Sequence, residues 1–196
     1  MVNPTSGSVR SFIAIEIPSA VKQALSELAT ALRGDNVRAR WVPAANYHLS
    51  IRFLGAISGE QRAAIESAFT SCCAVIEPFS LQARGCGVFN RRGIPRVVWA
   101  GVSGDLEPLR ALASAAESAA RDAGGAPIAS EYHPHITLGR IRDARDGAGV
   151  AHVLKLHALF DGGAIPVDRV SLFGSELNAD GAQYTRLHTF ALGKTE

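Results

Sequence analysis

The amino-acid sequence predicts an α+β protein that is bilobal, with two mainly antiparallel β-sheets facing a central cleft and helices packed outside. Two observations support this class. Strand-like and helix-like segments alternate, yet each of two histidine-bearing strands follows a short turn or an extended loop rather than a crossover helix. No segment has the composition of a linker between independent domains. Two lobes of this kind would bring the histidine strands together across the cleft.

The first half of the chain is expected to form three strands and two helices. Residues 1–8 are polar and predict a flexible tail, so that residues 9–194 form a single domain. Ser19 is placed to cap the first helix, and Gly55 is placed to close the third strand. Period-two and helical spacing of apolar residues predicts strands at 11–17, 37–42 and 47–54 and helices at 19–33 and 58–73.

The second half continues the alternation. A basic segment with one aromatic residue, Gly87–Gly93, is expected to be a loop between two neighbouring strands. Gly124 and Gly125 provide a stop signal for a long helix, and a turn around Asp180 precedes the last strand. The predicted elements are strands at 79–84, 96–102, 135–141, 165–175 and 183–192 and helices at 106–123 and 150–159.

Composition describes an ordinary globular protein, with 47% hydrophobic and 19% charged residues. The net charge of +2 does not by itself predict a nucleic-acid partner. Seventeen of the 20 basic residues are arginine, which suits forked phosphate contacts, although an arginine-rich genome explains the excess equally well. Three cysteines without metal-type spacing indicate free thiols, and no apolar run approaches the roughly 20 residues of a membrane span. We expect a cytoplasmic monomer.

Two four-residue motifs, 87 positions apart, share one pattern. His48-Leu49-Ser50-Ile51 and His135-Ile136-Thr137-Leu138 both alternate a polar residue with an aliphatic one, which is typical of a strand with one buried face. Each motif therefore directs an imidazole and a hydroxyl to the same side. A single histidine on such a strand is usually structural, but the repetition, with an arginine closely following each copy, predicts two halves of one functional site.

These motifs resemble those of the two-histidine (2H) phosphoesterase superfamily, whose mark is a pair of H-x-[ST] motifs. The resemblance extends to its RNA 2′,3′-cyclic phosphodiesterase branch, also called 2′–5′ RNA ligase, and covers nearly the whole chain in order. Ser50 replaces the commoner threonine, and Gly139 stands where an apolar residue is frequent. Further similar stretches are Arg10–Ile15, Arg40–Pro43, His48–Gly55, Pro95–Gly101, Pro134–Arg140 and Leu172–Leu177.

The resemblance implies metal-independent hydrolysis of RNA 2′,3′-cyclic phosphate ends to 2′-phosphates, with possible reversal to 2′–5′ ligation and no cofactor. Two imidazoles on opposite sides of phosphorus can protonate the leaving oxygen and deprotonate water near neutral pH. We assign His48 as general acid and His135 as general base, although a mirrored site permits the reverse. Ser50 and Thr137 are expected to donate to phosphate oxygens, and Arg140 to add a charge-assisted contact.

Other side chains are candidates for binding the RNA. Arg52 is two residues beyond Ser50 and is predicted to share its face and contact a phosphate, with a surface charge as the alternative. Aromatic residues near the motifs, Tyr47, Phe89 and Tyr132, are candidates for stacking on a base. Arg91 and Arg92 are candidates for following an RNA strand, with a solvated turn as the alternative.

Two other functions compete with this reading. His133 and His135 form an H-x-H pair that, with His48, could ligate the metal of a hydrolase, but Pro134 lies between them and no carboxylate or cysteine partner is evident. Alternatively, the cleft could bind RNA ends without turnover. The presence of both histidines and both hydroxyls disfavours an inactive site of that type.

Overall fold

The structure, a computed structural model, describes residues 7–128, 131–143, 145, 149–178 and 181–193. Most of the expected tail, Asp180 of the expected turn and the last residue of the expected domain lie outside the described residues. The strands are β1 (Val9–Glu16), β2 (Arg40–Trp41), β3 (His48–Ile57), β4 (Phe79–Arg91), β5 (Ile94–Gly104), β6 (His135–Arg140), β7 (Asp161–Val167), β8 (Arg169–Asn178) and β9 (Gly181–Ala191). The helices are α1 (Ser19–Gly34), η1 (Ala44–Asn46), α2 (Gly59–Cys73), α3 (Leu106–Asp122) and α4 (Val150–Leu156).

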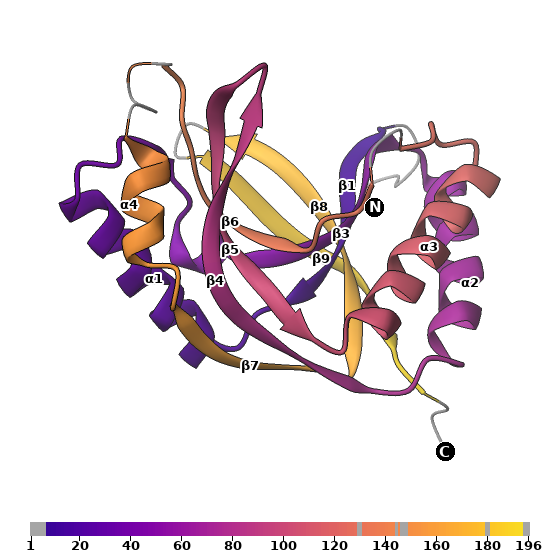
Figure 1. Cartoon of the computed structure of the whole chain (residues 1–196). Helices are drawn as coiled ribbons and strands as arrows, with labels where there is room; N and C mark the ends of the chain where they lie inside the picture. The colour runs from indigo at the N-terminus through magenta and orange to yellow at the C-terminus, as the bar shows by residue number, and fades with distance from the viewer. Residues whose placement is uncertain (1–6, 129–130, 144, 146–148, 179–180, 194–196) are drawn as a thin grey trace.

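The strands form an antiparallel sheet with helices outside it, which confirms the α+β class. Its order is β7-β4-β5-β6-β3-β1-β8-β9, and β2 pairs with β6. The two expected sheets are therefore two halves of one hydrogen-bonded sheet, joined where β3 meets β6. Figure 1 shows this sheet curling between two groups of helices. The histidine strands are direct neighbours at the junction of these two halves.

Three boundaries differ from the prediction. The expected loop Gly87–Gly93 is instead part of a long β-hairpin, in which β4 and β5 pair up to Arg91 and Ile94. The expected strand 165–175 is two strands: β7 is at one end of the sheet order, and β8 is next to the last strand at the other end. The third strand continues through Gly55, whose φ of 75° provides a left-handed kink that favours glycine.

The helices cover the sheet in two groups. Figure 1 shows α1 and α4 at one end of the molecule and α2 and α3 at the other. The predicted apolar face of α1 is confirmed, because its buried side chains include Val21, Leu25, Leu28 and Leu32. Ser19 is the first helical residue and Pro18 occupies the cap position, so the expected serine cap is wrong. No helix among the described residues combines the length and apolarity needed to cross a bilayer.

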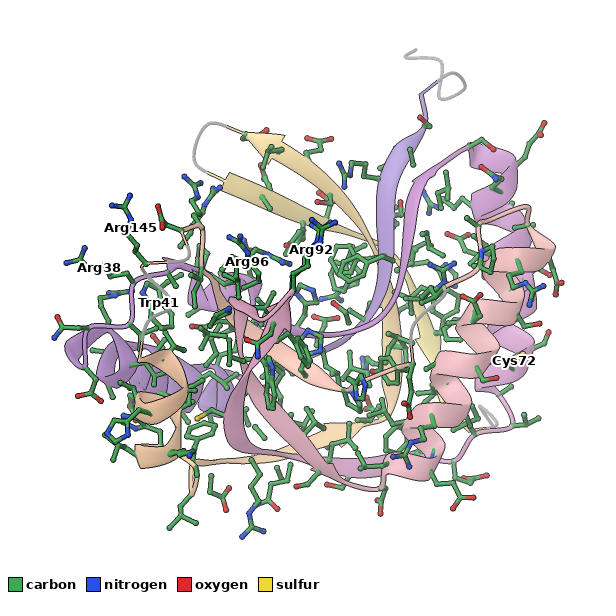
Figure 2. The ribbon with its side chains drawn as sticks, turned by 45° about the horizontal axis from the view of Figure 1, so that its top comes forward. Arg38, Trp41, Cys72, Arg92, Arg96 and Arg145 are labelled. Atoms are coloured by element: carbon green, nitrogen blue, oxygen red, sulfur yellow. The ribbon has the colours of Figure 1, made fainter. Side chains whose placement is uncertain are left out.

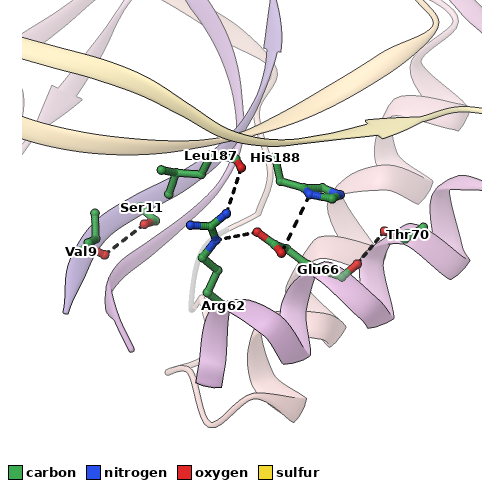
Figure 3. A network of polar contacts seen from close by, with 7 residues as sticks. All are labelled: Val9, Ser11, Arg62, Glu66, Thr70, Leu187 and His188. Carbon is green, nitrogen blue, oxygen red and sulfur yellow. Dashed lines mark hydrogen bonds and ion pairs between the residues drawn. The ribbon is translucent and has the colours of Figure 1, made fainter. Parts of the chain in front are cut away.

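A polar network attaches α2 to the last strand (Figure 3). The Arg62 guanidinium contacts the Glu66 carboxylate at 2.6 Å and donates to the backbone carbonyl of Leu187 at 2.9 Å. The rings of Phe69 on α2 and Phe190 on β9 also pack edge to face, with their centroids 4.8 Å apart. Polar and apolar contacts together fix α2 against β9.

Candidate active site

The two histidine motifs lie side by side at the centre of the sheet. Leu49 on β3 pairs with Ile136 on β6, and both side chains are 0% exposed. Burying an aliphatic side chain of this size contributes about 1.5–3 kcal/mol, so the strands are held with these residues inward. A slip of one residue would place the histidines in the core. Their alternation therefore directs both imidazoles and both hydroxyls outward.

The antiparallel register brings the four polar side chains into one group. Continued outward from the Leu49–Ile136 pair, the antiparallel register directs His48 toward Thr137 and Ser50 toward His135. Ser50 and His135 also line the same hollow. Each histidine thus faces the hydroxyl residue of the other motif. The arrangement has an approximate twofold symmetry about the junction of the strands.

Both histidines are oriented by the same kind of hydrogen bond. Nδ1 of His48 lies 2.8 Å from the carbonyl oxygen of Asn46, and Nδ1 of His135 lies 2.8 Å from that of His133. A carbonyl can only accept, so Nδ1 carries a proton in each ring and Nε2 remains free for chemistry. Within the H-x-H pair, His133 therefore orients the ring of His135 through its backbone carbonyl. Among the described residues, no three His, Cys, Asp or Glu side chains cluster as metal ligands would.

Burial lowers the pKa of both imidazoles. For His48 and His135 alike, loss of water around the ring is the main cause, and the backbone hydrogen bond opposes it in part. The positive charge of Arg140 lowers the pKa of both rings further, and the charge of His135 also acts on His48. Two groups that influence each other titrate as a pair. Arg140, exposed at the end of β6, therefore lies electrostatically close to both histidines.

These shifts predict the pH dependence of any reaction that needs one neutral and one protonated imidazole. Because both pKa values lie below the ordinary 6.5, kcat/KM should be bell-shaped with its maximum below pH 6.5, and should fall as the pH rises through neutrality. An Arg140→Gln variant should move the maximum to higher pH, because it removes a charge that lowers both values. Arg121→Gln, remote on α3, is the control. A maximum that stays in place or moves to lower pH would contradict this electrostatic role.

An aromatic ring packs edge-on against each histidine. The Tyr184 ring lies 5.4 Å from His48 at 89°, and the Phe89 ring lies 4.7 Å from His135 at 90°. Phe12 lies 4.9 Å from both His48 and Tyr184. Sequence reasoning missed Phe12 and Tyr184, because β1 and β9 are far from both motifs in the chain. The one available signal was an aromatic residue, Tyr184, among the polar residues at the start of β9.

Phe89 owes its position to the hairpin. Trp99 is the cross-strand partner of Gly87, and a Cβ atom at residue 87 would lie 2.2 Å from the indole ring. Only glycine leaves room for the indole to lie across β4 at this point. The Trp99 ring in turn packs 5.2 Å from Phe89. The hairpin therefore supports His135 through the rings of Trp99 and Phe89. The loop that the sequence predicted here would not have held Phe89 in place.

Two of the predicted stacking residues are engaged within the protein. Tyr47 is 3% exposed and belongs to the core, because it precedes His48 on the strand and faces the opposite side, so its stacking role is corrected. The Tyr132 hydroxyl donates to the Ser50 carbonyl at 3.1 Å, which supports the strand that carries Ser50. Burial raises the pKa of Tyr132, so the hydroxyl keeps its proton for this bond.

Arg52 is the largest correction. Its side chain is 7% exposed, and Nε lies 2.6 Å from Oε2 of Glu117 on α3, an ion pair in which neither atom forms a well-aligned hydrogen bond. The guanidinium also donates to the backbone carbonyls of Phe53 and Ala126. A β-bulge at Ile51 causes this, since Arg52 and Ser50 pair with consecutive residues of β1. The extra residue interrupts the alternation of the strand. Arg52 still lines the hollow that Ser50 and His135 share, but its guanidinium is engaged within the protein.

Two hollows are each lined by one of the two histidines, and a third shares Phe89 with the second. One of 460 Å³ lies beside His48 and includes Phe12, Lys22 and Tyr184. A second of 530 Å³ lies beside His135 and Ser50 and includes Tyr132. A groove of 730 Å³ runs under the β4–β5 hairpin, where Arg91 and Arg92 are exposed; it is lined by Phe89, Asn90, Arg91, Arg92, Ile94, Arg96, Val97, Arg140 and Ile141. The ring of Phe89 borders both of the last two.

Known proteins are similar in sequence to this chain along most of its length. A model described as LigT like Phosphoesterase matches residues 15–99 and 102–184. An RNA 2′,3′-cyclic phosphodiesterase of Aeropyrum pernix is 32% identical over 164 residues, which are 84% of this chain and 92% of that protein. A protein of the same name from Methanothermobacter thermautotrophicus is 28% identical, over 94% of this chain and 99% of its own.

Solved structures agree with these sequence relatives. The crystal structure of E. coli LigT in its apo form superposes with a TM-score of 0.79 at 26% identity, covering 96% of this chain and all of that one. The E. coli LigT complex with 3′-AMP gives a TM-score of 0.78 at 25% identity, covering 94% and 98%. The paired histidine motifs, the curled antiparallel sheet and the matched family model lead to the same conclusion: this chain belongs to the LigT-like phosphoesterase family.

Proposed function

We propose that this protein is a metal-independent RNA 2′,3′-cyclic phosphodiesterase that opens the cyclic phosphate to a 2′-phosphate. The observation that carries the proposal is the pair of histidines at the β3–β6 junction, each held through Nδ1 by a backbone carbonyl. The relatives named RNA 2′,3′-cyclic phosphodiesterase support the substrate class. The two free Nε2 atoms supply the base and the acid that such a reaction requires.

In the proposed reaction, His135 takes a proton from water, whose oxygen forms a bond to phosphorus. The bond between phosphorus and the ribose 3′ oxygen breaks, and His48 gives that oxygen its proton. The product carries a 2′-phosphate and a 3′-hydroxyl. If the attacking group is instead the 5′-hydroxyl of a second RNA, the same steps form a 2′–5′ phosphodiester bond. The symmetry of the site also permits the two histidines to exchange roles.

Charge on the phosphate is stabilised by the remaining polar groups. Ser50 and Thr137 donate from their hydroxyls to the non-bridging oxygens, where negative charge increases in the transition state. Arg140, whose charge acts on both imidazoles, adds a charge-assisted contact to the same oxygens. Arg52 has no direct part in this scheme, because Glu117 and two carbonyls already engage it.

The test of the function is incubation with 2′,3′-cyclic mononucleotides and short RNAs that end in a cyclic phosphate, followed by identification of the product. A 2′-monophosphate, formed equally in the presence of EDTA, is the expected result. Binding without product would support the alternative of a non-catalytic RNA-end binder. Loss of turnover in EDTA, with recovery on adding a divalent metal, would support a metal hydrolase instead.

The hydroxyl donors make a separate prediction. Replacing Ser50 or Thr137 with alanine should lower kcat by about 10- to 100-fold, the equivalent of one hydrogen bond to a charged group. The effect on KM should be smaller, because the donors act mainly on charge that develops in the transition state. Ser50→Thr, which restores a hydroxyl, is the matched control. A change in KM alone would assign these residues to ground-state binding.

A further inference from the structure

The three hollows around the histidines differ in charge. The hollow beside His48 contains one carboxylate, Glu16, and one ammonium group, Lys22. The hollow beside His135 contains two of each sign, Glu117 and Glu131 with Arg52 and Arg110. The groove under the β4–β5 hairpin, which we call the arginine groove, is lined by Arg91, Arg92, Arg96 and Arg140, and its described lining includes no carboxylate. The charges balance in the first two hollows, so a chain of phosphates is attracted most strongly along the third.

The arginines of this groove are largely uncompensated. Arg91 and Arg92 are exposed at the hairpin tip, and in the part of the chain that the structure describes neither they nor Arg140 form an ion pair. Arg96 donates to the backbone carbonyl of Arg142 at 2.5 Å. After the hydrogen bonds from Arg145, the charge of Arg96 also helps to lower the pKa of the Asp143 carboxyl, so Arg96 alone of the four is compensated in part. Figure 2 shows Arg92 and Arg96 near one another over the sheet, away from Arg38 at the periphery.

A second observation indicates an external anion. Arg40 of β2 is the cross-strand partner of Arg140 of β6. Like charges directly opposite each other on neighbouring strands destabilise a sheet. The fold thus holds Arg40 beside Arg140, and neither forms an ion pair within the described part of the chain. A bound polyanion would remove this repulsion, and forked guanidinium groups are suited to phosphate oxygens.

We propose that the arginine groove binds the backbone phosphates of an RNA strand on the 5′ side of its cyclic phosphate end. This inference rests on the proposed function and specifies its substrate: an oligoribonucleotide rather than a free cyclic mononucleotide. Arg140 lies where the groove meets the histidines, so the strand leaves the site beneath the hairpin. The ring of Phe89 separates this phosphate path from the less basic hollow beside His135.

The test compares the protein with an Arg91→Gln/Arg92→Gln variant, which keeps long side chains and removes two charges. Binding of an RNA that ends in a 2′-phosphate is measured across a salt series, so that no turnover occurs. For single-stranded nucleic acid, each phosphate contact makes the slope of log K against log salt concentration steeper by about 0.7. The variant slope should therefore be shallower by about 1.4. Arg38→Gln/Arg121→Gln, two exposed arginines outside the groove, controls for net charge.

A second readout separates this inference from the function on which it rests. In the unaltered protein, kcat/KM should rise from a cyclic mononucleotide to cyclic-ended RNAs of two to four nucleotides. The double glutamine variant should lose this dependence on length, while the control variant keeps it. An unchanged slope and an unchanged length dependence would overturn the groove and leave the enzyme intact. Failure of the unaltered protein to hydrolyse any cyclic substrate would overturn the function itself.

Discussion

Replacing either His48 or His135 with alanine is expected to lower kcat by about 10²- to 10⁴-fold on a 2′,3′-cyclic phosphate. Each ring is held by one carbonyl and presents one free nitrogen, so no neighbouring group in the described site can take over its proton transfer. Because the two rings serve one reaction, the double variant should lose little more than either single one. Product formation from a cyclic mononucleotide, with saturating substrate, measures the effect.

His48→Asn and His135→Asn serve as matched variants, since asparagine can still donate to the backbone carbonyl but cannot transfer a proton near neutral pH. They should be as inactive as the alanine variants. His152→Ala, at an exposed position on α4, controls for loss of an unrelated histidine. A single histidine variant that is folded and turns over at nearly the original rate would exclude the acid–base scheme.

Removing Glu117 is expected to give a large loss of stability. Glu117→Ala leaves the guanidinium of Arg52 buried at 7% exposure without its anionic partner. Breaking a buried ion pair from one side costs about 3–5 kcal/mol, because the remaining charge stays uncompensated. The backbone carbonyls of Phe53 and Ala126 remain as acceptors, so we expect about 3 kcal/mol. Urea unfolding of the variant and the original protein measures the difference.

A paired substitution distinguishes a structural Arg52 from a phosphate ligand. Arg52→Met/Glu117→Leu replaces both charges with apolar side chains of similar size, and should cost less than Glu117→Ala alone. Arg169→Ala, which breaks an exposed pair with Asp168, should cost at most about 1 kcal/mol. If the paired variant folds and its kcat/KM falls by orders of magnitude, Arg52 contacts the substrate after all.

Local patterns in the sequence were sufficient for several features. Alternation of apolar residues identifies the two histidine strands and their outward face, because the period of a strand is independent of what surrounds it. Helical spacing likewise identifies the buried face of α1. The paired motifs also indicate the family, since the chemistry depends on residue types and spacing within each strand. Each strand or helix can be inferred from four to sixteen neighbouring residues, and the family from two such motifs taken together.

Contacts between distant segments determined the rest. The pairing of Leu49 with Ile136 joins two halves that the sequence had left as separate sheets, and no local pattern encodes which strands become neighbours. The bulge at Ile51 depends on the register with β1, and the ion pair of Arg52 depends on Glu117 of α3, 65 positions away in the chain. Phe89 approaches His135 only because Trp99 packs across Gly87 from the opposite strand. Side-chain direction follows local periodicity until pairing with another strand interrupts it, and the proximity of chemical groups follows from the packing of the whole chain.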